Sequence, residues 1–193
     1  MKILGIVGSP RKRHNTDLLV EQILQGASAG GAETEKIYLN DLNIRPCQYC
    51  NYCRKKGICR LEDDMQAVYQ KLEEAAGVVI GTPTFYGDIS AQTKTFIDRC
   101  YRYVEVIDNG DGTMSFPSRF KERKKLVMVS VCGSFGPETF EKQVEVIKLL
   151  CNDLNAEYLD QLLVPKTDWY PVKDNREILE RAFQIGIRLA HKG

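Results

Sequence analysis

The chain has 193 residues, of which 43% are hydrophobic and 27% are charged, and its formal net charge is +1. This length allows one α/β domain with a sizeable core, and the composition excludes a disordered chain and a dedicated nucleic-acid binder. The first apolar run, Ile3 to Val7, is too short for a signal peptide or a membrane span. We therefore expect a cytoplasmic protein that binds neither membranes nor nucleic acids.

Five apolar runs with the character of β-strands alternate with longer segments of helical periodicity. The runs lie at residues 2–8, 34–40, 77–83, 125–131 and 156–164. A final helix is expected from about Asn175 to Ala190. Strand followed by helix, repeated five times, predicts a parallel sheet with helices on both faces, which is a doubly wound α/β fold. We expect a single domain over residues 1–193, with loop insertions at about 44–62 and 105–124, where the alternation is interrupted.

The loop after the first strand, GSPRKRHNTDLL, has the composition of an anion site. Backbone N–H groups and the positive end of a helix dipole converge in such a loop. Four side chains could complete a phosphate cradle: Ser9, Arg11, Asn15 and Thr16. Neither the G-x-G-x-x-G fingerprint nor the G-x4-G-K-[ST] pattern occurs here. By itself, the loop is equally compatible with an ordinary strand-to-helix turn capped by Asn15 or Thr16.

Two further loops end neighbouring strands at the sheet edge where open α/β folds bind ligands. In GTPTFYG, a proline stiffens the turn, two aromatic rings offer flat surface and a glycine allows close approach of a ligand. In SVCGSFGPE, small residues can donate hydrogen bonds. These features suit a flat ring system. The residues concerned are Pro83, Thr84, Phe85, Tyr86 and Gly87 in the first loop and Cys132, Gly133 and Ser134 in the second.

The stretches GSPRKRHNT and GTPTFYGDISAQTKTFIDR resemble the NAD(P)H-dependent flavin mononucleotide (FMN) reductase branch of the flavodoxin-like superfamily. The resemblance covers residue 1 to about 165 and implies a five-stranded parallel sheet in the order 2-1-3-4-5. It also implies that the four residues of the first loop hold the FMN phosphate. The loop after the third strand would border the isoalloxazine ring, and the loop after the fourth would close its other side. A homodimer or homotetramer is implied as well.

The segment PCQYCNYCRKKGIC contains four of the seven cysteines, in the spacing C-x2-C-x2-C-x5-C. They are Cys47, Cys50, Cys53 and Cys59. Two residues between ligands let one tight loop wrap a cube-shaped [4Fe–4S] cluster. Zinc, a redox-active disulfide and free thiols remain open as alternatives, although zinc usually draws on separated cysteine pairs and a disulfide suits the cytoplasm poorly. The motif resembles that of iron–sulfur flavoproteins, which implies that the four cysteines ligate a [4Fe–4S] cluster.

Basic residues surround the cysteine motif. They would stabilise an anionic cluster, or form a docking patch for an acidic electron donor such as ferredoxin. They are Arg54, Lys55, Lys56 and Arg60.

Several other residues have simpler structural interpretations. Asp98 and Arg99 are expected to form an ion pair on a helix. The basic run at residues 119–125 is expected to face solvent rather than RNA, because the net charge is only +1. The cysteines outside the motif are expected to be small buried residues. They are Cys100, Cys132 and Cys151.

Two enzymatic functions follow from the resemblance. In the first, a [4Fe–4S] cluster takes electrons from a carrier and relays them through FMN to a small acceptor. In the second, a cluster-free reductase transfers hydride from NAD(P)H to bound FMN and then reduces a flavin or a quinone. The first requires no acid or base residue, and we assign no catalytic side chain. A carrier protein without a substrate of its own is a third interpretation.

Overall fold

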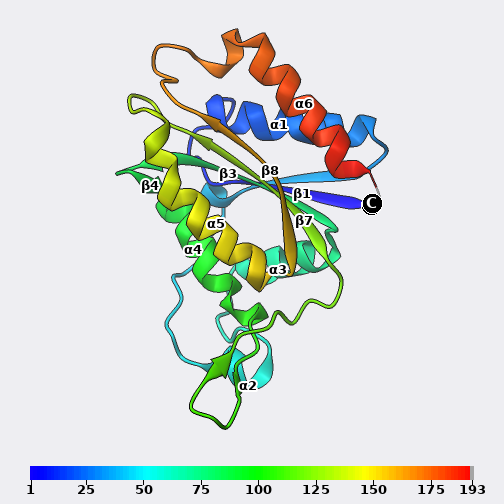
Figure 1. Ribbon diagram of the computed structural model, residues 1–193, viewed down its shortest axis with the longest axis vertical. Helices are drawn as coiled ribbons and strands as arrows, with labels where there is room; N and C mark the ends of the chain where they lie inside the picture. Colours follow the sequence, from blue (N-terminus) through cyan, green and yellow to red (C-terminus); the bar gives the residue numbers. More distant parts are fainter. Residues whose placement is uncertain (192–193) are drawn as a thin grey trace.

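A computed structural model describes residues 1–191 of the chain, and its central element is a parallel sheet (Figure 1). The sheet runs in the order β2-β1-β3-β7-β8, with parallel pairing at every junction. Its strands are β1 (Lys2–Val7), β2 (Glu33–Tyr38), β3 (Gly77–Phe85), β7 (Lys124–Val131) and β8 (Ala156–Val164). The predicted fold class and strand order are confirmed.

Helices cover both faces of the sheet, so that its central strands are buried on two sides. On one face lie α1 (Asn15–Ala29) and α6 (Arg176–Ala190). On the other face lie α3 (Met65–Glu74), α4 (Ala91–Arg99) and α5 (Glu141–Asp153). Two hydrophobic cores result, and this double burial explains why the central strands β1, β3 and β7 are near-continuous apolar runs, whereas the edge strands β2 and β8 also carry charged residues.

Short elements are added to this frame. A two-residue strand, β4 (Asp88–Ile89), pairs antiparallel with the end of β3. The two predicted insertions carry α2 (Tyr52–Lys56) and the hairpin of β5 (Ile107–Asp108) and β6 (Met114–Ser115). The remaining elements are 3-10 turns, η1 (Leu39–Asp41), η2 (Cys100–Tyr103), η3 (Pro137–Phe140) and η4 (Val172–Asp174). Both insertions lie together in the lower part of Figure 1, away from the layered body of the domain.

The expectation that residues 119–125 face solvent is wrong for Lys124 and holds only in part for Arg119 and Phe120, which are half-buried. Lys124 is 4% exposed, and its ammonium group donates hydrogen bonds to the carbonyls of Ala75 and Glu73 at the end of α3. A cation at a helix carboxyl end satisfies carbonyls that have no partner within the helix. The sequence run could not show this, because the helix end that binds the ammonium lies far away in the chain.

None of the helices within residues 1–191 is both long enough and apolar enough to span a membrane.

Helices α1 and α6 pack closely because each presents a glycine to the other. A Cβ atom built on Gly26 would lie 1.9 Å from the Phe183 carbonyl oxygen, and one built on Gly186 would lie 1.9 Å from that of Ile23. Both contacts are with backbone, which cannot turn aside as a flexible side chain can. This contact anchors α1, and the loop that enters α1 is the predicted phosphate loop.

Gly26→Ala is therefore expected to lower the free energy of unfolding by about 1–3 kcal/mol, because the added methyl group overpacks the α1–α6 contact. Urea denaturation of the purified protein measures this change. Ser28→Ala, at an exposed position of the same helix, is the matched control and should change stability by less than about 0.5 kcal/mol. Equal stability of the Gly26→Ala variant and the unaltered protein would contradict the close helix contact.

Candidate functional site

The three loops predicted to form a flavin site lie side by side. They follow β1, β3 and β7, which are adjacent parallel strands, so their carboxyl ends meet at one edge of the sheet. The Gly8 N–H donates to the Gly81 carbonyl at 2.7 Å, and the Ser90 hydroxyl donates to the Gly8 carbonyl at 2.7 Å. The loop after β1 is thereby tied to β3 and to the start of α4.

The side chains of the phosphate loop are partly committed to contacts within the protein. Ser9 is buried, and its hydroxyl accepts the Arg11 N–H at 3.2 Å. The Arg11 guanidinium donates to Nδ1 of His14 at 2.7 Å and is exposed. The Asn15 side-chain oxygen accepts the Val172 N–H at 3.1 Å, which binds the loop after β8 to this site. Thr16 is 2% exposed and lies beneath the loop.

Asp17 shapes this loop, and the sequence analysis missed it. Arg13 has a left-handed φ of 59°, and its N–H donates to Asp17 at 2.6 Å. Lys36 and Tyr38 on β2 donate to the same carboxylate. Burial by itself would raise the pKa of Asp17, but the Lys36 ammonium and the Arg13 N–H outweigh it, so the pKa lies below its ordinary value. The carboxylate thus stays ionised and holds the loop in a conformation that is unusual for arginine.

The loop after β3 is a tight hairpin that displays aromatic surface. Tyr86 and Gly87 both have positive φ, of 54° and 76°, which is the pattern of a type I′ turn between β3 and β4. Tyr86 is fully exposed, and Phe85 is 48% exposed. The Thr84 hydroxyl accepts a hydrogen bond from Gln143 on α5 at 2.9 Å, which anchors the base of the hairpin.

The loop after β7 is joined to the loop after β8. The Cys132 carbonyl accepts the Thr167 N–H at 2.9 Å, and the Ser134 hydroxyl donates to Asp168 at 3.1 Å. A Cβ on Gly133 would lie 2.5 Å from an Asp168 carboxylate oxygen, so the Asp168 side chain packs directly against the backbone of this loop. Cys132 is 2% exposed, which confirms its predicted burial. Cys100 and Cys151 are buried as well.

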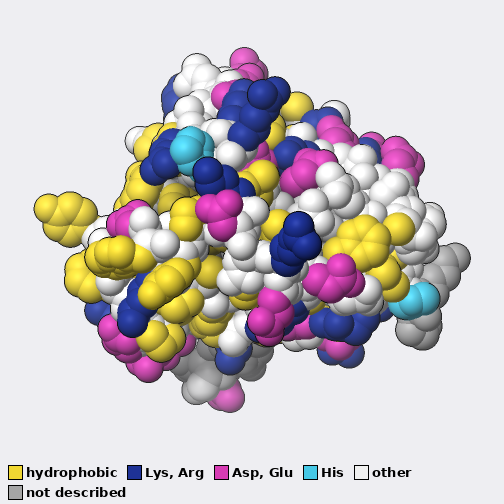
Figure 2. All heavy atoms as spheres, turned by 90° about the horizontal axis from the view of Figure 1, so that it is seen from above, with side chains coloured by type: hydrophobic (Ala, Val, Ile, Leu, Met, Phe, Trp, Pro, Cys, Tyr) yellow, Lys and Arg dark blue, Asp and Glu magenta, His cyan; other side chains and the backbone are white. Residues whose placement is uncertain are grey.

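Sequence reasoning missed the loop after β8, although it follows a strand as the other three do. Trp169 and Tyr170 expose large aromatic surface at this edge. Figure 2 shows hydrophobic side chains gathered at the left, the side on which β4 lies in Figure 1, with basic side chains and a histidine close by. Arg11, Arg13 and Lys173 are among the residues that line a pocket between the phosphate loop and this loop. The edge therefore combines a basic end with an aromatic end.

The four motif cysteines lie elsewhere, at the opposite end of α4. All four line one pocket, which Arg99 and Arg102 also line. The loop adopts left-handed φ at three positions, Tyr49, Asn51 and Gly57. The pKa of the Cys53 thiol is raised, mainly because the thiol is buried and to a smaller extent because the sulfurs of Cys59 and Cys47 lie nearby. Within residues 1–191, no three cysteine, histidine or acidic side chains are gathered tightly enough to hold a metal ion as they stand.

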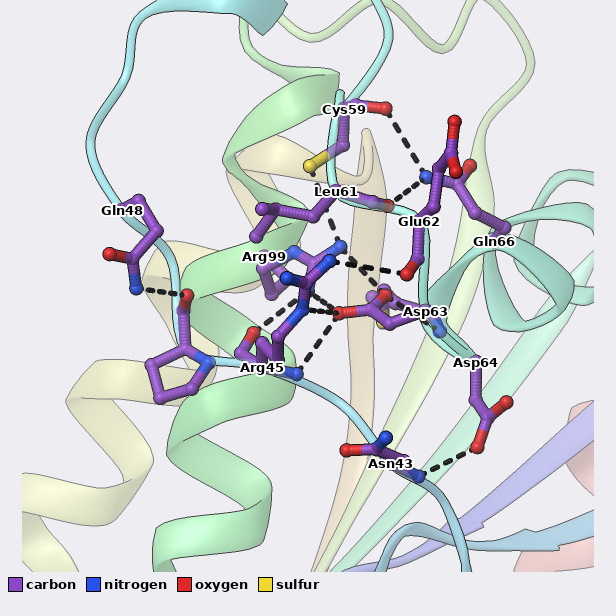
Figure 3. A network of polar contacts seen from close by, with 12 residues as sticks. Asn43, Arg45, Gln48, Cys59, Leu61, Glu62, Asp63, Asp64, Gln66 and Arg99 are labelled. Atoms are coloured by element: carbon purple, nitrogen blue, oxygen red, sulfur yellow. Dashed lines mark hydrogen bonds and ion pairs between the residues drawn. The ribbon is translucent and has the colours of Figure 1, made fainter.

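The predicted ion pair between Asp98 and Arg99 is wrong. Asp98 pairs with Lys94 one turn earlier, while Arg99 pairs with Asp63 at 2.6 Å. Neighbouring residues on a helix point in different directions, whereas residues four apart share a face. Arg99 therefore points into the cysteine pocket, and its guanidinium lies 3.5 Å from the Cys59 sulfur (Figure 3).

The donor set of this pocket suits an anionic group. Among residues 1–191, five buried side-chain polar atoms have no hydrogen-bond partner. All five lie in or beside the cysteine loop. Four of them are guanidinium Nε atoms, which can only donate. A buried donor without an acceptor is costly, and an anionic acceptor bound in the pocket would satisfy the Nε–H groups of Arg99 and Arg102, which line it. The atoms are Asn51 Oδ1 and the Nε atoms of Arg54, Arg99, Arg102 and Arg119.

Comparison with known proteins assigns the family. The family model described as NADPH-dependent FMN reductase matches residues 1–147. The chain belongs to this family. An iron–sulfur flavoprotein of Methanocaldococcus jannaschii is 43% identical over 99 residues, which are 51% of this chain and 51% of that protein. An iron–sulfur flavoprotein of Methanosarcina thermophila is 36% identical over 99 residues, which are 51% of this chain and 52% of that protein. The chain thus spans about half the length of the curated relatives it matches.

Solved structures agree on the fold of this family member. A flavone reductase superposes with a TM-score of 0.73 at 26% identity, over 98% of this chain and 62% of that chain. A flavodoxin from the domain Archaea superposes with a TM-score of 0.58 at 14% identity, over 98% and 96% of the two chains. An NAD(P)H:quinone oxidoreductase from Methanothermobacter marburgensis does so with a TM-score of 0.70 at 15% identity, over 100% and 98%. The flavodoxin-like fold is confirmed.

Asp17→Asn is expected to destabilise the protein at neutral pH and to flatten the dependence of its stability on pH. Because the folded-state pKa lies below the ordinary value of 3.8, the Asp17 carboxylate stabilises the fold above that pH. This contribution is lost as the pH falls through the folded-state value. We expect a loss of about 1–3 kcal/mol in the free energy of unfolding at pH 7, measured by urea denaturation, and a smaller difference near pH 3.

Asp98→Asn is the matched control, because Asp98 forms an exposed pair with Lys94. It should change stability by about 0.5 kcal/mol or less. If the Asp17 variant kept the stability and the pH profile of the unaltered protein, Asp17 would not hold the loop.

Proposed function

We propose that this protein is an FMN-dependent oxidoreductase that relays electrons through a [4Fe–4S] cluster and FMN to a small acceptor. The observation that carries the proposal is the cysteine pocket: four thiols line one cavity, and within residues 1–191 the buried Nε–H groups of Arg99 and Arg102, which line the same cavity, have no acceptor. A cluster with four thiolate ligands carries negative charge and sulfur acceptors, which would satisfy these donors. Membership in the FMN reductase family and the iron–sulfur relatives support the same assignment.

The ligands of the proposed cluster are Cys47, Cys50, Cys53 and Cys59. Cys47 and Cys50 are exposed, whereas Cys53 and Cys59 are half-buried, so the outer part of the loop would close over the group when it binds. When bound, the cluster would supply one-electron transfer, and the flavin would supply a two-electron site that also accepts single electrons.

FMN is proposed to lie at the carboxyl edge of β1, β3 and β7. The phosphate loop would hold the phosphate through Ser9, Arg11, Asn15 and Thr16, together with its backbone N–H groups. The hairpin from Pro83 to Gly87 would border the ring system, and Cys132, Gly133 and Ser134 would close the other side. The protein's part is to bind and orient the flavin, so no side chain is assigned as an acid or base.

A second candidate is a cluster-free reductase that uses NAD(P)H. It is favoured by the open hollow beside the hairpin, which Tyr86, Gly87 and Phe135 line and where a nicotinamide could stack on a flavin.

Two protein partners are proposed. Exposed Lys55, Lys56 and Arg60 would dock an acidic donor of the ferredoxin type, and the exposed aromatic edge suits a homodimer or homotetramer.

Anaerobic purification followed by iron and sulfide analysis tests the proposed cluster. We expect about four irons per FMN, and loss of iron with retention of FMN in Cys50→Ser, because a [4Fe–4S] cluster needs all four thiolates. Cys151→Ser, which alters a buried cysteine outside the motif, is the matched control and should keep its iron. Absence of iron after anaerobic reconstitution, together with rapid bleaching of the flavin by NAD(P)H alone, would instead establish the cluster-free reductase.

Arg11→Ala is expected to weaken FMN binding by about 10- to 100-fold while leaving riboflavin binding unchanged, because only FMN carries the phosphate that Arg11 would contact. Quenching of flavin fluorescence measures both affinities. Lys12→Ala is the matched control, since Lys12 carries the same charge but pairs with Asp41. An equal loss for both flavins would show that Arg11 does not hold the phosphate.

A further inference from the structure

We propose that Arg99 is a positioning residue for the cluster: it closes the cysteine loop through Asp63 and donates a hydrogen bond to the Cys59 sulfur, which raises the reduction potential of the bound cluster. This inference rests on the proposed function, because it concerns the same pocket. It assigns to one arginine outside the cysteine motif two tasks that the motif cannot perform itself.

The first task is closure of the loop. The Arg99 guanidinium donates to the Arg45 carbonyl at 2.8 Å and to both oxygens of Asp63, at 2.6 and 3.0 Å (Figure 3). The Arg45 N–H also donates to Asp63 at 3.0 Å. Arg45 precedes the first motif cysteine, and Asp63 follows the last one. One ion pair thus joins the two ends of the cysteine loop and fixes both to the end of α4.

This ion pair is buried, which is the reason that it can act as a clamp. The side chains of Arg99 and Asp63 are 1% and 2% exposed. A buried charge must be paired and hydrogen-bonded, and breaking such a pair costs far more than breaking one in water. Asp63 also accepts the N–H of Met65 at the start of α3. The clamp therefore belongs to the core of the domain, although the loop that it closes lies at the surface.

The second task is electrostatic. Arg99 Nη2 lies 3.5 Å from the Cys59 sulfur, and the carboxylate of Asp63 binds the same guanidinium. The arrangement presents an N–H donor to the sulfur. Reduction of a [4Fe–4S] cluster adds one electron and no proton, so it adds negative charge. A buried N–H donor stabilises that added charge and raises the potential.

The unpaired Nε–H of Arg99 adds an independent observation. It is buried and has no acceptor, and Arg99 lines the cysteine pocket. Arg60, the basic neighbour of Cys59 in the chain, is exposed by contrast. Because the effective dielectric constant falls from about 80 in water to about 20 at protein sites, an exposed charge next to the cluster influences it less than a buried one does.

The experiment uses the purified, cluster-containing protein and measures iron content and the midpoint potential of the cluster by an EPR-monitored redox titration. The potential should fall in Arg99→Gln, which removes the charged donor. It should rise in Asp63→Asn, which leaves the arginine without its counter-charge. Arg60→Gln is the matched control and should move the potential less than Arg99→Gln does. Opposite shifts for the two partners are the signature of an electrostatic role, because a purely structural role has no reason to give opposite signs.

The double variant Arg99→Gln/Asp63→Asn guards against failure of the single variants to fold. It replaces the buried ion pair with a neutral amide pair and leaves no uncompensated charge. Its potential should lie below that of the unaltered protein. An unchanged potential in a double variant that retains its iron would overturn the inference, as would shifts of the same sign in the single variants. Absence of iron from the unaltered protein would instead overturn the proposed function, so the two failures are distinguishable.

Discussion

Burial of the parallel sheet on both faces is the constraint on which the rest of this molecule depends. Helices α1 and α6 pack on one face, and α3, α4 and α5 pack on the other. Neither face is left free for a ligand. Because the five strands run in one direction, the loops at their carboxyl ends gather at a single edge. The phosphate loop, the aromatic hairpin and the loop after β7 meet there for this reason.

Helix α4 sets the relation between the two candidate sites. At its start, the Ser90 hydroxyl caps the helix and donates to the Gly8 carbonyl of the phosphate loop. At its end, Arg99 enters the cysteine pocket. Nine residues separate these ends, which corresponds to about 13 Å of helix. The proposed flavin edge and the cysteine pocket are thus distinct places in the domain, connected by one helix that is packed into the core.

Two carboxylates that no sequence motif marks hold the loops of the two candidate sites in place. Asp17 and Asp63 look like ordinary surface carboxylates in the chain, yet both are nearly inaccessible to solvent and each binds a cation and a backbone N–H. In each case the carboxylate supports a loop that contains a left-handed residue or several. Such conformations cost free energy and persist only where surrounding contacts determine them.

The sequence by itself determined the fold class, the strand order implied by resemblance, and the loops that would carry function, because apolar runs and turn residues are local signals. It also indicated the cysteine pocket through spacing alone. It could not show the two-residue strand β4, the aromatic pair Trp169 and Tyr170 at the proposed flavin edge, or the burial of Lys124, since these depend on what lies nearby in space.

Only the tertiary structure determined which charged side chains form ion pairs. Asp98 and Arg99 are adjacent in the chain and look like partners, but neighbouring side chains on a helix point in different directions. Arg99 instead pairs with Asp63, which lies 36 positions away in the sequence. A buried charge must find its counter-charge wherever the fold places one. That requirement, which no local pattern records, brings the two ends of the cysteine loop together beside a guanidinium.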